Sequence, residues 1–520
     1  MKNEKLANAF NQVDDRYIAE AAAPKARKPY WIGAVAAVLA LIIAISAIPG
    51  IDHPEPTHNM DVPPMSTAPS NPPTIASRPS TDPSYPNDPL PNYGSIDLSA
   101  LLDLQDLLAA PRYPSMVQYP KRDDYPDDWK AYDQAYSAWR ENQNALYNQP
   151  TGYADSLEDF FYQSIQQFLT GEENGAYSPV NVYMAMAMLA ETTDGESRQQ
   201  ILDLFGLDTI EQLRTQVNHL WNAHFSDDGL TTLVMSNSLW LDDAYTFRPD
   251  AVDRLSKDYF ASVFGGDLGS DESNAQLQTW LDAMTGGLLS EQAKNVELSR
   301  DAVFALASTI YFKAGWLAEF SEAATKENVF HAPNGDVTVS FMNQTAKDTY
   351  YRGSNFGAVR LALTGGNHMW IILPDEGFTV AQVLAGSEYL EMTLHPNDWP
   401  NQQYVTLQIS LPKFDVSQQS DLIKGMKNMG ITNVFDSTTS DFSPIYGGIS
   451  RLFVSQINHA ARVVIDEEGV IAAAFTVIEV NDEGVGPDLP VITFTVDRPF
   501  AFIVSSRDNL PLFAGVVTQP

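Results

Sequence analysis

The spacing of apolar positions divides the chain after residue 155 into a helical half and a strand half. Amphipathic patterns with the helical period cover residues 156–169, 181–191, 197–204, 209–221 and 250–259. Strand patterns, either alternating or more fully apolar, cover residues 303–312, 368–374, 404–411, 461–465 and 492–496. Because helices and strands are segregated along the chain, the pattern predicts an α+β fold.

The stretch after residues 461–465 combines a hinge with a second strand-like run. Gly469 removes the side chain at the point where the chain would have to turn. Alternate positions after it are small or apolar and would share one face of an extended segment: Val470, Ala472, Ala474 and Thr476, with Ala473 on the other face. Residues 481–488 are rich in turn formers and acids, which predicts an exposed loop tip where a protease could cut.

The N-terminal region contains one candidate membrane span. Residues 30–48 carry no charge, and their number approaches the ~20 residues that cross a bilayer, so we predict a transmembrane helix. Lys25, Arg27 and Lys28 lie just before it. Since basic residues concentrate on the cytoplasmic side of a span, residues 1–29 are expected to be cytoplasmic.

A cleavable signal peptide is the alternative for the same residues. Ala47 would then stand at the cleavage site, and the protein would be secreted. The long segment before the apolar run, and the bulk of Ile45, favour a retained anchor. We therefore expect a single-pass protein of the cell membrane whose main domain is extracellular.

Two segments separate the span from the main domain. Residues 49–95 are dominated by Pro, Ser, Thr, Asn and Asp and have too little apolar surface for a core, so they predict an extended, disordered stalk. Residues 96–155 predict a helical extension. Its aromatic residues fall at helical spacing: Trp129, Tyr132, Tyr136 and Trp139. We expect this stripe to pack against the main domain, and a surface for a partner is the alternative.

Composition narrows the partners and the chemistry. With 66 acidic against 31 basic residues the net charge is −35, which argues against nucleic-acid binding and indicates a soluble surface, so we expect a monomer. The acidic pairs Asp227-Asp228 and Asp271-Glu272 are interpreted as solvated surface. Cysteine is absent, the histidines lack metal-ligand spacing, and no catalytic or nucleotide-binding motif occurs. We therefore expect no metal and no cofactor.

Further motifs occur in a fixed order along the chain. They are residues 177–189, 197–202, 237–240 and 310–316, Leu411-Pro412-Lys413-Phe414, Asp497-Arg498-Pro499-Phe500 and residues 512–517. Together with the stretch 466–476 they resemble the serpin family, in its prokaryotic type, over residues 156–520. The resemblance implies the serpin fold, in which helices pack around a large central mixed β-sheet and further sheets, with an exposed reactive centre loop.

The resemblance also implies a protease inhibitor. The target, a serine endopeptidase or alternatively a cysteine endopeptidase, cleaves the loop and is trapped as a covalent acyl-enzyme when the loop inserts into the central sheet. The chain itself would not be an enzyme, because the nucleophile belongs to the protease. The hinge residues that the resemblance assigns are Glu467, Gly469, Val470, Ala472, Ala473, Ala474 and Thr476. No proline or charge interrupts residues 470–476, which favours inhibition over a non-inhibitory surface interaction or adhesion module.

Four residues match positions in the sheet that opens. Trp316 and His459 correspond to positions below its top, which is compatible with ordinary core residues. Where serpins usually carry a serine this chain has Asn181, and where they usually carry an asparagine it has Ser308. We expect Asn181, Ser308 and His459 to meet in a buried hydrogen-bond network that latches the sheet, with donors and acceptors exchanged. Two unrelated polar residues are the alternative.

Two counts place the reactive bond differently. In inhibitory serpins the distance from the hinge glutamate to the cleaved residue, counted from Glu467, ends at Glu483 and predicts a cut before Gly484. Counting back from residues 497–500 leads to Asp488-Leu489 instead, because the loop is longer than in common family members. We prefer the first count, since extra length after the cut stays with the departing side.

Overall fold

The computed structural model describes residues 101, 104–300, 302–447, 452–470 and 489–520, all within one compact unit, Pro86–Pro520. The predicted cytoplasmic segment, span and stalk, residues 1–29, 30–48 and 49–95, lie outside the described residues. In the part of the chain that the structure describes, no helix combines the length and the apolar character needed to cross a bilayer. The membrane anchor therefore stays a prediction.

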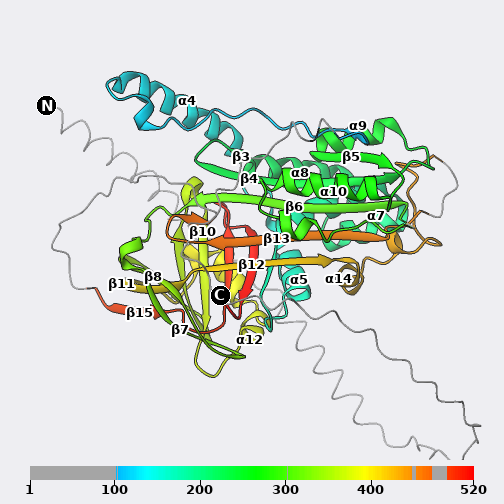
Figure 1. Ribbon diagram of the computed structural model, residues 1–520. Helices are drawn as coiled ribbons and strands as arrows, with labels where there is room; N and C mark the ends of the chain where they lie inside the picture. The colour runs from blue at the N-terminus through cyan, green and yellow to red at the C-terminus, as the bar shows by residue number, and fades with distance from the viewer. Residues whose placement is uncertain (1–100, 102–103, 301, 448–451, 471–488) are drawn as a thin grey trace, which may run out of the picture. The chain divides into compact units, whose positions relative to one another are not determined.

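Eight strands of the described residues form sheet A, in the order β1-β5-β4-β6-β14-β13-β12, with β3 paired to β4. Their bounds are β1 Leu107–Ala109, β3 Ser226–Asp227, β4 Thr231–Asp242, β5 Ala261–Gly266, β6 Phe304–Gly315, β12 Phe414–Asp421, β13 Gln456–Ile465 and β14 Gly469–Val470. The sheet is mixed, because β4 is antiparallel to β6 whereas β6 and β13 are parallel. Figure 1 shows β6, β13 and β12 running across the middle of the molecule.

Nine strands of the described residues form sheet B, in the order β15-β11-β8-β9-β10-β16-β17-β2, with β7 paired to β8. Their bounds are β2 Gly175–Tyr177, β7 Lys326–Ala332, β8 Gly335–Arg352, β9 Phe356–Ala362, β10 His368–Pro374, β11 Gln402–Pro412, β15 Val491–Thr495, β16 Phe500–Ser505 and β17 Pro511–Val517. Only Lys413 separates β11 of sheet B from β12 of sheet A. The two sheets are therefore joined here by a connection of one residue.

Helices pack on both faces of sheet A. Their bounds are α4 Trp129–Tyr147, α5 Glu158–Phe168, α6 Pro179–Thr192, α7 Gly195–Leu204, α8 Ile210–His224, α9 Pro249–Asp258, α10 Asp271–Met284, α11 Ser290–Ala293, α12 Val380–Leu384, α13 Glu388–Leu394 and α14 Ile423–Asn428. Short 3-10 helices are η1 Arg122–Asp124, η2 Asp155–Leu157, η3 Glu322–Ala324, η4 Thr364–Gly366, η5 Pro396–Asp398 and η6 Asn433–Phe435. The predicted helices and strands are present with shifted ends, and the α+β fold class is confirmed.

Helix α6 is the central helix of the core. Ser178 caps it by accepting a hydrogen bond from the backbone amide of Asn181 (3.3 Å), and Pro179 occupies the first helical position, where no amide is needed. Every residue of α6 is buried, which explains why its sequence has no polar stripe. Helix α10 packs on the opposite face of sheet A, with Leu277 and Trp280 in one cluster with residues of β4, β5 and β6.

The aromatic stripe of α4 is only partly buried. Trp139 packs edge-on against Tyr119, with ring centroids 5.0 Å apart, and its indole nitrogen donates to Asp228 (2.8 Å). Tyr136 also contacts Tyr119, whereas Trp129 is 63% exposed. The stripe therefore packs mainly on the preceding part of the extension and reaches the hairpin of β3 and β4 through Trp139.

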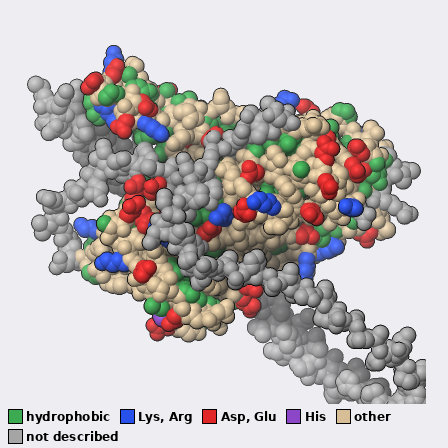
Figure 2. Space-filling view, viewed as in Figure 1, with side chains coloured by type: hydrophobic (Ala, Val, Ile, Leu, Met, Phe, Trp, Pro, Cys, Tyr) green, Lys and Arg blue, Asp and Glu red, His purple; other side chains and the backbone are tan. Residues whose placement is uncertain are grey.

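One surface assignment from the sequence is wrong. Asp228 is 2% exposed, and its carboxylate accepts hydrogen bonds from the side chains of Trp139 and Gln143 (2.8 Å each) and from two backbone amides just before and at the start of β4. Four donors stabilise the buried charge, so it needs no water. Asp271 and Glu272 are exposed in the first turn of α10, as expected. Figure 2 shows acidic side chains spread over the face in view.

Candidate functional site

The chain leaves β13 through a tight turn and re-enters sheet A as β14. The Asp466 carboxylate accepts hydrogen bonds from the backbone amides of Glu468 (2.9 Å) and Gly469 (3.2 Å), and the Asp466 amide donates to the Gly469 carbonyl (3.1 Å). Burial raises the pKa of Asp466, and the two amide hydrogen bonds oppose that rise. The turn therefore directs the chain back along the edge of β13.

Glycine is required where the returning chain meets β6. Gly469 is paired with Gly315, and a Cβ atom on Gly469 would overlap the carbonyl oxygen of Ala314 and lie 2.7 Å from the Cα atom of Gly315. Any side chain here would push β14 away from β6. The glycine singled out from the sequence is thus needed for close backbone approach.

Strand β14 lies between β6 and β13 and divides their contact into two regions. Val470 is buried opposite Ala314 of β6 and Ile465 of β13. Farther along, Ala305–Thr309 of β6 pairs directly with Gln456–Ala460 of β13. We call this direct pairing the closed seam and the region around β14 the open end. Sheet A is one strand wider at its open end, so β14 amounts to the start of an additional strand.

Glu467 fixes the turn to neighbouring elements. Its carboxylate accepts a hydrogen bond from the Thr325 hydroxyl (2.6 Å) and forms an ion pair with Lys413 (2.5 Å), while its carbonyl accepts from the Phe320 amide (3.1 Å). Burial alone would raise the pKa of Glu467, but the hydrogen bonds from Lys413 and Thr325 outweigh it and lower the pKa. The carboxylate is therefore charged at neutral pH.

Trp316 holds the turn from the β6 side. It is 1% exposed, its indole nitrogen donates to the Asp466 carbonyl (2.8 Å), and its amide donates to the Glu468 carbonyl (2.9 Å). One residue earlier, the Gly315 amide donates to the Thr364 hydroxyl (3.1 Å). The last residues of β6 are thus bonded both to the hinge turn and to η4, which connects β9 and β10 of sheet B.

A buried polar cluster lies at the closed seam. Asn181 donates from its side-chain nitrogen to the Ser308 hydroxyl (2.6 Å). The Ser178 amide donates to Nε2 of His459 (3.2 Å), and His459 is the register partner of Ser308 across the seam. The structure therefore brings Asn181, Ser308 and His459 together at one level of sheet A, with Ser178 as a fourth member.

Burial lowers the pKa of His459 to about 3, so the imidazole is neutral at physiological pH. Because Nε2 accepts from the Ser178 amide, the proton lies on Nδ1. Among the described residues, Nδ1 of His459 and the side-chain oxygen of Asn181 have no hydrogen-bond partner. The cluster therefore has one spare donor and one spare acceptor.

The other predicted site residues, Ala472, Ala473, Ala474, Thr476, Glu483 and Gly484, lie outside the described residues. Conversely, sequence reasoning did not single out Thr325, Thr364 or Lys413. Lys413 stood in one of the quoted motifs, so its charge could have been paired with a hinge acid. The two threonines have no local signal, because their partners are distant in sequence.

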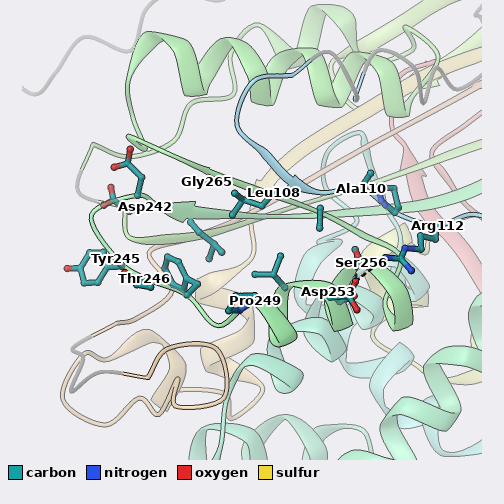
Figure 3. A pocket seen from close by; sticks show the side chains of 16 residues that line it. Leu108, Ala110, Arg112, Asp242, Tyr245, Thr246, Pro249, Asp253, Ser256 and Gly265 are labelled. Atoms are coloured by element: carbon teal, nitrogen blue, oxygen red, sulfur yellow. Dashed lines mark hydrogen bonds and ion pairs between the residues drawn. The ribbon is translucent and has the colours of Figure 1, made fainter.

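The extension completes a surface cavity of about 760 Å³ at the end of β4 that lies away from the open end. Leu108 and Ala110 line it from the extension, facing Pro249 of α9 and Gly265 of β5 (Figure 3). Arg112 and Asp253 form an ion pair at its side (3.0 Å). No cluster of three metal-ligating side chains occurs in the described ranges, here or elsewhere.

Comparison with known proteins identifies the family. The family model described as "Serpin (serine protease inhibitor)" matches residues 155–520. The chain is 27% identical to Serpin-ZX of Arabidopsis thaliana over 363 residues, covering 67% of this chain and 92% of that protein. It is 26% identical to antithrombin-III of Homo sapiens over 377 residues, covering 69% and 79%. The chain belongs to the serpin family.

Solved structures agree on the fold. The native state of tengpin, a thermophilic serpin, superposes with a TM-score of 0.64 at 22% identity and covers 72% of this chain and 95% of tengpin. The native, stressed conformation of Arabidopsis AtSerpin1 superposes with a TM-score of 0.61 at 23% identity and covers 71% and 99%. The serpin fold is therefore confirmed. The prokaryotic type stays a prediction.

Proposed function

We propose that this chain inhibits serine endopeptidases by the suicide mechanism of its family, in which loop cleavage leaves a covalent acyl-enzyme and the loop then inserts into sheet A. Members of the family are generally protease inhibitors, and some are not. The observation that carries the proposal is β14, two residues of the hinge that already lie between β6 and β13. Insertion would extend a strand that has begun.

The register of β14 specifies what the continuing strand would meet. Because Val470 pairs with Ala314 in an antiparallel sense, each step forward in the loop is one step back along β6. The same rule applies to β13. Ala472 would then lie between Phe312 and Val463, Ala474 between Ile310 and Ala461, and Thr476 between Ser308 and His459.

The face of each residue follows from the alternation of a strand. Val470 is buried in the core that contains α6, so Ala472, Ala474 and Thr476 would face the same core. Small side chains fit such a position without displacing the helix behind it. Thr476 would bring a hydroxyl to the cluster at the closed seam, which has a spare donor and a spare acceptor.

The length of β6 sets a lower limit on how far along the loop the cut can lie if the inserted strand is to pair with all of β6. In this register the loop reaches the level of Phe304, the first residue of β6, at residue 480. A cut after Glu483 leaves enough chain to pair with all of β6, and so does a cut after Asp488. We propose Glu483-Gly484 on the family distance from Glu467, with a glutamyl-preferring serine protease as the first target to test and a cysteine protease as the second.

A pair of matched variants tests the proposal. Ala472→Glu would place a charge in the core, whereas Ala473→Glu would place the same charge on the other face, which carries the ion pair of Arg462 with Asp415 (2.5 Å). The parent and Ala473→Glu are expected to form a gel-stable complex with the protease. Ala472→Glu is expected to be cut without being trapped. Equal yields from both variants would contradict insertion in this register.

The alternative, a non-inhibitory surface module, predicts no gel-stable complex with any protease in a panel. We further propose that residues 30–48 anchor the protein in a cell membrane, because the run is uncharged and follows basic residues. Cell fractionation tests this: an anchored chain is released by detergent only, and a mature N-terminus near residue 48 in the medium would contradict it.

A further inference from the structure

Residues 104–147 run over the serpin body as one continuous segment, which we call the strap. Its first part is fastened to the edge of sheet A and to α10. In β1, Leu107 pairs with Phe264 of β5. Asp106 and the buried Gln276 of α10 exchange two hydrogen bonds, one from the Gln276 side-chain nitrogen (2.6 Å) and one from the Asp106 amide (3.2 Å). β5 and α10 therefore carry the lower attachment of the strap.

The second part of the strap is fastened to other elements. The Tyr113 ring stacks on Trp221 of α8, with centroids 5.5 Å apart and planes at 26°. Helix α4 binds Asp228 of the β3–β4 hairpin as described above. At the end of α4, the guanidinium of Arg507, in the turn between β16 and β17, lies 4.0 Å from the centre of the Tyr147 ring. Helix α8 and the turn between β16 and β17 therefore carry the upper attachment, whereas Asp228 joins α4 to the β4 side of sheet A.

Helix α10 continues into a connector that crosses the closed seam. The connector, residues 285–300, leads from α10 to β6, but it also contacts β13 on the far side of the seam. The Arg462 side chain donates to the Leu288 carbonyl (2.8 Å), and the Gln456 side chain donates to the Glu297 carbonyl (3.0 Å). A contact that restrains α10 therefore also restrains the connector, which lies over the closed seam.

Opening the closed seam requires the elements of the lower attachment to move relative to those of the upper attachment. A new strand would separate β6 from β13 by one strand spacing, about 4.8 Å. Strand β12, which is paired with β13, is joined to β11 of sheet B by Lys413 and packs on sheet B through Phe414, which contacts Phe500 and Phe502. At the open end, Gly315 of β6 and Thr231 of β4 are both bonded to Thr364 of η4 (3.1 Å each). The group of β6, β4 and β5, with α10, would therefore pivot about that end, and its far part would shift relative to sheet B and α8. The strap is bonded to both sides of this shift.

We propose that the strap restrains sheet A in its closed form and so sets the rate at which the closed seam opens. The strap loses contacts on one side or the other when β4 and β5 shift, and those contacts oppose opening. The inference concerns a property of the sheet, and it depends on the proposed function only for its biological purpose, which is to delay insertion until the loop is cut.

Hydrogen exchange of the full chain, read by mass spectrometry, tests the strap directly. Tyr113→Ala removes the stack on Trp221, and Gln276→Leu removes both hydrogen bonds to Asp106 while keeping the side-chain size. Each variant is expected to accelerate exchange at Ala305–Thr309 and Gln456–Ala460 about tenfold, because local opening free energies follow the contacts that oppose opening. Amides of β10 in sheet B should exchange at the parental rate.

Arg112→Ala is the matched control on the strap. Its ion pair with Asp253 is 65% and 61% exposed on the two side chains, so its loss should leave exchange at the seam unchanged. Parental exchange at the seam in both Tyr113→Ala and Gln276→Leu would overturn the proposal, and so would equal acceleration in β10. Faster seam exchange in a chain that traps no protease would support the strap and contradict the inhibitor, so the two failures are distinguishable.

Discussion

The open end and the closed seam of sheet A are two regions of the same pair of strands that are held by different means. At the open end, the turn that leads into β14 is fixed by polar contacts of Asp466, Glu467 and Trp316. At the closed seam, β6 and β13 pair directly over a buried cluster that includes Asn181 and His459. In the proposed mechanism the first region would guide the entering strand, and the second would have to separate to admit it.

The difference assigns separate tasks to the two regions. Changes at the open end should alter where and whether insertion starts, because they displace β14. Changes at the closed seam should alter the stability of the uninserted sheet, because they leave buried polar groups without partners.

Gly469→Ala should have the largest effect on inhibition. The added Cβ overlaps the Ala314 carbonyl, so β14 would be displaced from β6 and insertion would lose its starting point. We expect the yield of covalent complex to fall at least about tenfold, as for other severe backbone clashes. In the control Gly386→Ala the nearest atom lies 3.5 Å away, and inhibition should be unchanged. A fully inhibitory Gly469→Ala protein would refute the role of close backbone approach.

The closed seam should lose stability in acid because of His459. Its pKa is lowered to about 3 in the folded chain, so between that value and about 6.5 the unfolded chain binds more protons and stability falls as the pH falls. The loss should reach about 1.6 kcal/mol at pH 5 relative to pH 6.5. Urea unfolding across this range should show a flatter pH profile for His459→Gln. An unchanged slope would mean that another group titrates.

The closed seam has an asparagine, Asn181, where serpins usually have a serine, and a serine, Ser308, where they usually have an asparagine. Substitution can restore the usual arrangement. Asn181→Ser or Ser308→Asn alone should destabilise the native form by about 1–2 kcal/mol, because each leaves a mismatched pair in a buried site. The double variant restores one amide and one hydroxyl and should recover most of the loss. Unfolding midpoints of the four proteins give the coupling energy. Additive losses in the double variant would mean that the two side chains act independently.

Glu467→Gln should have the smallest effect, about 1 kcal/mol, since its partner Lys413 is 40% exposed and screened by water. The pKa of Glu467 is lowered in the folded chain, so its contribution is present at neutral pH and is lost as the pH falls below the ordinary value of 4.5. Glu322→Gln, an exposed residue nearby, is the control. Equal unfolding midpoints for Glu467→Gln and the parent at pH 7 would show that the ion pair with Lys413 does not stabilise the folded chain.

The sequence predicted the fold more completely than the site. Periodicity located the strands on both sides of the seam, and Gly469 with the alternation after it pointed to a strand that can insert. It did not predict that β14 is already paired, because register depends on β6, more than 150 residues away. Asp228 was misassigned for the same reason: its donors, Trp139 and Gln143, are 89 and 85 residues distant. Trp129 shows the converse, a helical aromatic residue that stays exposed.

If β14 is the first part of a longer strand, a crystal structure of the loop-cleaved protein will show the rest of that strand in sheet A. Cleavage after Glu483 by a glutamyl-specific protease, followed by structure determination, gives the register of the loop against β6. We expect Ala472 opposite Phe312 and Thr476 opposite Ser308, with β6 and β13 no longer paired with each other. Direct pairing of Ala305–Thr309 with Gln456–Ala460 in the cleaved protein would contradict it.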